Sequence, residues 1–138
     1  MLSLGPIEEK YRFVEQVRKL AALGLKLHGT PGTAEAMQTV GIDVSSHSKD
    51  SDDPNGALAQ IDSGEIDLVI NIPIGFDDQG RPDGYLIRRC AVDAGVPLLT
   101  DRHLAKAVVE ALERYPTASS LSIEPWSRFT ERLSLIHI

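Results

Sequence analysis

Residues 66–72, which read Ile-Asp-Leu-Val-Ile-Asn-Ile, form the stretch that decides the fold. Leu68, Val69 and Ile70 give an extended chain apolar side chains on both faces. This is typical of a strand inside a parallel sheet that helices cover on both sides. We therefore expect this strand to be central in the sheet, with Asn71 near its carboxyl end.

Short apolar runs alternate with helical patterns on both sides of this strand. The other expected strands are 2–5, 25–29, 42–44 and 96–100. The expected helices are 8–23, 34–39, 57–61, 85–94 and 101–114, the last one capped by Asp101. The short strand–helix spacings predict an α/β fold, a three-layer doubly wound sheet of about five parallel strands.

The composition fits one globular domain. The 138 residues are 42% hydrophobic and 25% charged, and the net charge is -6. This acidic balance argues against a general nucleic-acid-binding protein, and no apolar run approaches the roughly 18 residues of a membrane span. The single cysteine, Cys90, cannot form an internal disulfide. We expect a soluble cytoplasmic domain that binds neither nucleic acid nor membrane.

The end of the chain differs in pattern from the rest. Residues 133–138 read LSLIHI and follow no helical or strand period. They match the translation of a common sequencing-library adapter, and an ordinary apolar chain end is the alternative. The domain is therefore expected to span residues 1–130, with 131–138 as a non-native or disordered tail. Whether the chain is a piece of a longer protein stays open.

The segment 30–33, Thr-Pro-Gly-Thr, is the most informative short motif. Gly32 lies between the hydroxyls of Thr30 and Thr33, in a turn expected between a strand and a helix. Free backbone N–H groups and two hydroxyls at a helix N-terminus suit a phosphate. The alternative is a capped helix start in which Thr33 is the N-cap.

Three further polar residues follow expected strands, at the edge where open α/β sheets bind ligands. Lys10 lies in the first turn of a helix, where the dipole disfavours a cation that does not face an anion. Lys49 lies in the polar loop 45–55, and Asn71 offers an amide. The alternatives are solvated surface lysines and an asparagine that stabilises its own turn.

Other reactive side chains carry weaker signals. Asp50, Asp52 and Asp53 suggest metal or general-base chemistry less than they suggest a solvated, flexible loop. No two of the four histidines have the spacing of metal ligands. Cys90 lies inside an expected helix and is predicted to be buried rather than nucleophilic. We expect no catalytic residue, no metal and no cofactor.

Three segments carry a resemblance to a known family. Residues 64–71 (GEIDLVIN), 83–92 (DGYLIRRCAV) and 96–100 (VPLLT) resemble the methylglyoxal-synthase-like (MGS-like) domain family. The match is closest to the C-terminal allosteric domain of the carbamoyl-phosphate synthetase large chain. The resemblance covers residues 2–129.

The resemblance implies an MGS-like fold and a regulatory domain without chemistry of its own. Such a domain binds a small anionic effector and acts on synthetase domains, in cis or in trans, in pyrimidine or arginine biosynthesis. Bacterial relatives bind nucleotides such as UMP and IMP. Urea-cycle relatives bind N-acetylglutamate, and a chain of that branch would be mitochondrial.

The resemblance also implies a set of site residues. The phosphate-binding lysine of the family, its two threonines, its second lysine and its asparagine match Lys10, Thr30, Thr33, Lys49 and Asn71. Residues 72–73, Ile-Pro, stand where nucleotide-binding relatives have a pair of threonines. This departure favours the acetylglutamate branch, whose further asparagines and tryptophan have no clear match here, so the effector stays open.

The alternative within the family is methylglyoxal synthase, which eliminates phosphate from dihydroxyacetone phosphate with a carboxylate base and a histidine. Residues 4–10 keep only Lys10 of its opening motif, and Gly80 stands where the active-site histidine belongs. Residues 51–54, Ser-Asp-Asp-Pro, replace the segment that carries the base. We therefore expect no such activity.

Overall fold

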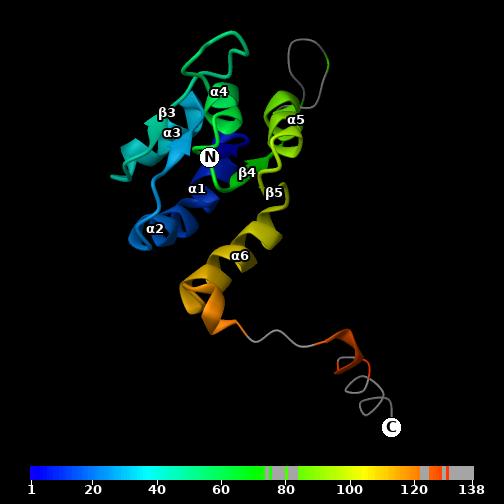
Figure 1. Cartoon of the computed structure of the whole chain (residues 1–138). Coiled ribbons are helices and arrows are strands. Elements are labelled where there is room, and N and C mark those ends of the chain that lie inside the picture. The colour runs from blue at the N-terminus through cyan, green and yellow to red at the C-terminus, as the bar shows by residue number, and fades with distance from the viewer. Residues whose placement is uncertain (74, 76–79, 81–83, 122–124, 129, 131–138) are drawn as a thin grey trace.

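Five parallel strands form one sheet in the order β3-β2-β1-β4-β5 (Figure 1). The strands are β1 (Leu2–Leu4), β2 (His28–Gly29), β3 (Ser45–Ser46), β4 (Val69–Ile72) and β5 (Leu98–Leu99). The computed structural model describes residues 1–73, 75, 80, 84–121, 125–128 and 130. The sheet confirms the predicted α/β class and the predicted number of strands.

The apolar stretch that predicted a central strand contains β4, which pairs with β1 on one side and β5 on the other. All four residues of β4 are buried. The strand in the middle of the sheet is β1, which pairs with β2 and β4. β4 is thus an interior strand, as expected, although it is next to the middle one.

Helices cover both faces of the sheet and make it the middle of three layers. One apolar core joins β1 and β4 to α2 (Val14–Ala22), α3 (Pro31–Thr39) and α6 (Arg102–Arg114). The other lies between the sheet, α4 (Ala57–Asp62) and α5 (Tyr85–Asp93), which lie side by side in Figure 1. Alternation along β4 explains this division, because Ile70 and Ile72 enter the first core and Val69 enters the second.

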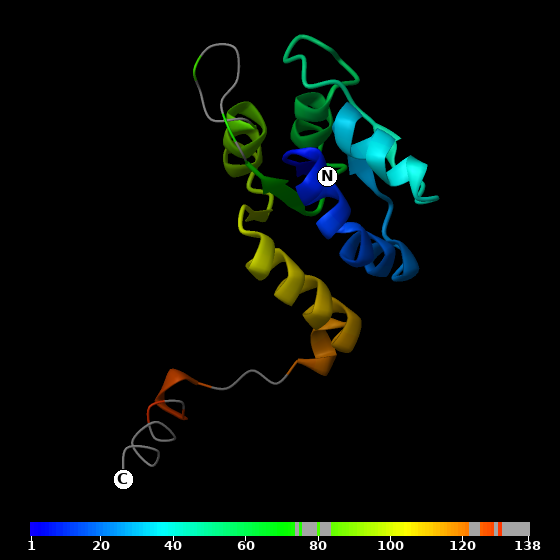
Figure 2. The ribbon, with the colours of Figure 1, turned by 180° about the vertical axis from the view of Figure 1, so that it is seen from behind.

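The helix expected over residues 8–23 is in fact two helices, α1 (Ile7–Arg12) and α2, which Figure 2 shows from behind. The chain leaves helical geometry at Phe13, whose φ and ψ are -98° and 1°. Phe13 is only 1% exposed, whereas α1 buries none of its residues. The break lets the ring enter the core while α1 stays at the surface.

Two boundaries differ from the sequence prediction near the edge of the sheet. The strand expected over 42–44 forms instead at Ser45–Ser46, which pairs with β2, because Ile42 and Val44 are buried in the core before the ladder begins. The segment 30–33 is not a turn before the helix. Thr30 is the N-cap of α3 and Pro31 its first residue, a position that suits the fixed φ of proline.

The helices expected over 57–61, 85–94 and 101–114 agree to within one residue, whereas β2 and β4 each begin three residues later than expected. The side chain of Asp101 caps α6 by accepting a hydrogen bond from the N–H of Leu104 at 2.8 Å. A short 3-10 helix, η1 (Ala118–Ser120), follows. The expected loop 75–84 lies mostly, and the tail 131–138 wholly, outside the described residues. Among the described residues, no helix has the length and apolarity needed to cross a membrane.

Candidate anion-binding site

The chain order creates a reversal point between β1 and β4. From β1 the chain moves outward to β2 and β3, and it then returns to place β4 on the other side of β1. At such a reversal the segments leaving neighbouring strands diverge, and open α/β sheets bind ligands in the crevice at the carboxyl ends. The predicted site residues are therefore described from this point outward.

Two buried threonines tie α3 to the end of β1. The Thr33 hydroxyl oxygen accepts a hydrogen bond from the N–H of Leu4 at 3.0 Å and a second one from the Thr30 hydroxyl at 3.2 Å. Thr33 is 0% exposed and Thr30 is 2% exposed. Thr33 is therefore not the N-cap of α3, and the hydroxyls fix the start of this helix against the strand end.

Lys10 lies over the first turn of α3. A methyl group at Gly32 would lie 3.4 Å from the Lys10 ammonium nitrogen and 3.5 Å from its Cε atom. The partial positive charge at a helix N-terminus repels a cation. Two positive groups held this close favour an anion between or beside them, and the missing side chain of Gly32 leaves the backbone of this turn accessible.

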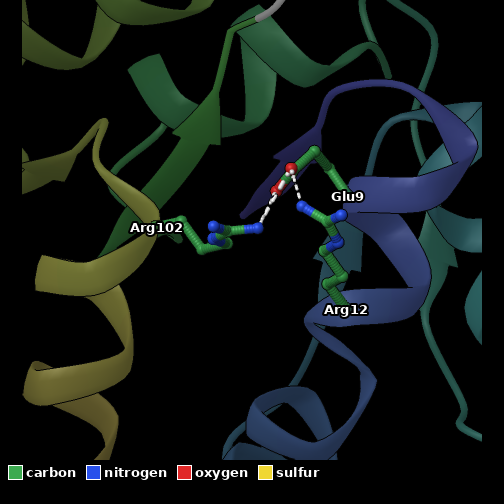
Figure 3. A network of polar contacts seen from close by, with 3 residues as sticks. All are labelled: Glu9, Arg12 and Arg102. Carbon is green, nitrogen blue, oxygen red and sulfur yellow. Dashed lines mark hydrogen bonds and ion pairs between the residues drawn. The ribbon is translucent and has the colours of Figure 1, made fainter.

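A three-residue ion network holds the helix that carries Lys10 (Figure 3). Arg102 at the start of α6 donates to both carboxylate oxygens of Glu9, at 3.2 and 3.4 Å. Arg12 donates to the same carboxylate at 3.4 Å. Because the side chain of Glu9 is only 14% exposed, this contact links α1 to α6 in a partly dehydrated setting.

Asn71 is almost fully buried at the reversal point, at 1% exposure. Its Nδ2 donates to the Ser3 carbonyl oxygen of β1 at 2.9 Å, and its Oδ1 accepts from a guanidinium nitrogen of Arg88 in α5. Both ends of the amide are thus bonded within the chain. Through these two bonds Asn71 joins β4, β1 and α5.

Gly84, which precedes α5, completes this arrangement. Its φ is +75°, and a methyl group there would lie 2.6 Å from Nδ2 of Asn71. Arg88 was not among the residues predicted for the site. The sequence did offer a signal for Arg88, namely the i,i+4 spacing of Arg89 and Asp93. These two side chains form an exposed ion pair at 3.0 Å, so the neighbouring Arg88 is the arginine that turns toward the interior.

Lys49 is exposed in the loop after β3. The loop is largely exposed to solvent, and its acidic side chains also bond to its own backbone. Asp50 accepts from the N–H of Asp52 at 2.9 Å, and Asp53 accepts from the N–H of Asn55 at 2.8 Å. The acidic side chains therefore help to shape an exposed loop, and Asp50 and Asp52 face solvent as expected.

Two other features lie away from this site. A cavity of about 310 Å³ opens at the opposite edge of the sheet, where Met1, Leu27 and Leu68 precede or begin their strands. The Cys90 thiol donates to the Leu58 carbonyl oxygen at 3.5 Å, and burial raises its pKa, as expected for an unreactive thiol. In the described part of the chain, no three His, Cys, Asp or Glu side chains group as metal ligands do.

The fold and the reversal point define a class of protein. The sequence pattern of the family described as "MGS-like domain" matches residues 12–100, and the chain belongs to this family. A solved structure, methylglyoxal synthase from Elizabethkingia anophelis, has a TM-score of 0.57 over 78% of this chain and 74% of its own. At 21% identity it supports the fold alone.

The curated relatives narrow this class. The chain is 36% identical to the carbamoyl phosphate synthase large chain of Methanosphaerula palustris, over 83% of this chain and 11% of that protein. It is 43% identical to the "Carbamoyl phosphate synthase large chain, C-terminal section" of Methanopyrus kandleri, over 76% of this chain and 19% of that protein. The multifunctional protein URA2 of Saccharomyces cerevisiae is 39% identical over 83% of this chain and 6% of that protein. The chain thus spans less than a fifth of the length of these relatives.

Proposed function

We propose that this chain is the effector-binding regulatory domain of a carbamoyl-phosphate synthetase large chain, or a free-standing relative of that domain. The observation that carries the proposal is the Lys10 ammonium group beside Gly32 in the first turn of α3, at the carboxyl edge of the sheet. The likeness to synthetase large chains supports the assignment to this kind of enzyme.

The ligand proposed for this edge is a small phosphorylated or carboxylated anion. The chain carries a net charge of -6, so a cation at a helix N-terminus creates a locally positive place on an acidic molecule. Thr30, Gly32 and Thr33 would form the floor, with Lys10 and Lys49 supplying charge. Asn71 would hold the strands and Arg88 in place rather than contact the anion through a free amide.

UMP, IMP and N-acetylglutamate are the proposed effectors, and the partners are synthetase domains in cis or in trans. Residues 72–73, Ile-Pro, favour a carboxylate effector of the acetylglutamate kind over a nucleotide. The domain would act in the cytoplasm, or in mitochondria for a chain of the urea-cycle type. It would perform no chemistry itself, and the purified protein would not convert dihydroxyacetone phosphate to methylglyoxal.

A thermal-shift panel tests this function. The protein is heated with UMP, IMP, N-acetylglutamate, phosphate or sulfate, alongside the variant Lys10→Ala and the control Lys26→Ala, a lysine next to the cavity at the opposite edge. A ligand at 100 times its Kd stabilises a domain by about 2.7 kcal/mol. For a domain of this size that is a rise in Tm of roughly 5–10 °C.

We expect at least one anion to raise the Tm of the wild type and of Lys26→Ala, and to raise that of Lys10→Ala much less. The proposal fails if none of the five anions changes the Tm of the wild type. It also fails if Lys10→Ala responds as strongly as the control.

A further inference from the structure

Two histidines far apart in the sequence bond to each other, one in β2 next to the cavity at the opposite edge and one directly after β3. Nδ1 of His28 in β2 lies 2.8 Å from Nε2 of His47, and the ring centroids are 5.0 Å apart. His47 follows β3 directly, and its Nδ1 lies 3.0 Å from the Asn55 carbonyl oxygen. The two rings thus connect the interior of the sheet to the loop that carries Lys49.

The partners of these rings fix their protons. The Asn55 carbonyl oxygen only accepts, so Nδ1 of His47 carries a hydrogen. In neutral His47 the other nitrogen, Nε2, is then bare and accepts the Nδ1–H of His28. The contacts form one directed chain of hydrogen bonds from His28 through His47 to Asn55, and neutral imidazoles satisfy it completely.

Backbone hydrogen bonds close the loop that carries Lys49 at both of its ends. The N–H of His47 donates to the Gly29 carbonyl oxygen at 2.8 Å, and the N–H of Ala57 donates to the Ser48 carbonyl oxygen at 2.7 Å. Gly56 is enclosed by loop carbonyls, since a methyl group there would lie 3.0 Å from the oxygens of Ser48 and Asp50. The ring of His47 spans this closed loop from its first residue to Asn55.

We propose that His28 and His47 are positioning residues for the anion site, whose neutral pair holds Lys49 at the sheet edge and makes anion affinity depend on pH. The proposal rests on the proposed function, because Lys49 matters here as a ligand of the anion. Neither histidine touches the anion in this account. Each acts through the loop backbone.

Added protons break this arrangement only when the two rings together take up a second one. One added proton can be placed on Nε2 of His28 without loss of either hydrogen bond. A second proton places two N–H groups across the same 2.8 Å gap, and the bond between the rings is lost. The charged groups around His28 are the Met1 amino group and Lys26, which oppose its protonation, and Glu65, which favours it.

The pKa of His28 is lowered from 6.5, first by burial and then by His47. The folded domain therefore takes up this proton at lower pH than the unfolded chain does. The contribution to stability is complete above about pH 6.5 and declines as the pH falls through the lowered value.

The test measures sulfate binding by calorimetry at about pH 8 and about pH 5, on either side of the ordinary pKa of histidine, where sulfate keeps its charge. His28→Leu removes the donor. His28→Asn places an amide N–H near the position of Nδ1 but cannot titrate. His103→Leu, at an exposed histidine of α6, is the matched control, and Lys49→Ala reports the contribution of the lysine.

We expect His28→Leu to weaken sulfate binding about fivefold at the higher pH, the loss of roughly one hydrogen bond. Lys49→Ala should weaken it at least as much, and His28→Asn should bind like the wild type. At the lower pH the wild type should lose affinity relative to His28→Asn. Amide exchange of residues 47–56 should accelerate in His28→Leu and stay slow in the control.

The outcomes separate the two proposals. If Lys49→Ala weakens binding while His28→Leu binds sulfate like the wild type, the positioning role is wrong and the anion site stands. Equal pH profiles for the wild type and His28→Asn would also overturn the positioning role. If neither sulfate nor any of the other four anions binds the wild type, both proposals fail together.

Discussion

Two regions contribute to the candidate site, and they are held in place differently. One is the reversal point between β1 and β4, and the other is the loop after β3. At the reversal point Asn71 and Thr33 are almost fully buried, and their polar atoms bond strand ends and helices. In the loop, Lys49 is exposed, and its neighbours are held by local hydrogen bonds and by His47. The first region gains its geometry from the fold, and the second depends on a few exposed contacts.

This difference predicts where substitutions act. A change at the reversal point leaves a buried polar group without its partner, which costs stability in the whole domain. A change in the loop leaves solvent to replace the lost partner, so the cost falls on ligand affinity rather than on the fold.

The largest effect is expected at Gly84. Alanine there meets both a left-handed backbone, at φ +75°, and the Asn71 amide, 2.6 Å from the new methyl group. The backbone term alone is about 1–2 kcal/mol, and the displaced amide adds roughly 1–3 kcal/mol. Urea unfolding of Gly84→Ala should therefore show a loss of about 2–5 kcal/mol.

Gly64→Ala is the matched control, because its φ is +84° and nothing lies within 4 Å of the new methyl group. It should lose only the backbone term. Equal losses in the two variants would show that the contact between Gly84 and Asn71 contributes nothing.

The next effect is expected at Asn71 itself. Asn71→Ala removes its hydrogen bonds with the Ser3 carbonyl oxygen and with the Arg88 guanidinium group. The expected loss is about 2–3 kcal/mol in urea unfolding. The exposed Asn55→Ala, whose backbone carbonyl still receives His47, should stay within about 0.5 kcal/mol of the wild type. A loss at Asn71 no greater than this would contradict the buried role.

Much of the fold could be predicted from the sequence, because the patterns that indicate its strands and helices are local. The apolar run 66–72 marked an interior strand, and Asp101 marked the start of α6. Both depend on neighbours within a few residues. The break at Phe13 depends on a core position that only the assembled sheet defines. The helical periodicity of residues 8–23 therefore gave no sign of the break.

The location of the candidate site could be predicted from the sequence, whereas the roles of its individual residues could be predicted less well. The carboxyl edge of the sheet followed from strand order alone. The bond between Asn71 and Ser3 joins residues 68 positions apart in the sequence, and the bond between His28 and His47 joins residues 19 positions apart. No spacing rule within one helix or strand reports such a contact, and two isolated histidines gave no signal of a pair.

The smallest effect is expected at the ion network that holds α1. Arg102→Gln removes the link from α6 to Glu9 but leaves Arg12 at 3.4 Å. Arg102 is 33% exposed, so solvent screens much of the interaction, and the expected loss is about 0.5–1 kcal/mol. Arg89→Gln breaks an ion pair whose side chains are 65% and 59% exposed, and should change stability less.

The more informative readout is anion affinity, because Glu9 directly precedes Lys10 in α1. If the network fixes this short helix, Arg102→Gln should weaken sulfate or phosphate binding about twofold to fivefold, the range of a contact worth 0.5–1 kcal/mol. Arg89→Gln should leave the affinity unchanged. An Arg102→Gln variant that binds the anion like the wild type would show that Phe13, packed at the end of α1, positions Lys10 without help from α6. In that case apolar packing alone would position α1, whereas the reversal point would still depend on the buried hydrogen bonds of Asn71 and Thr33.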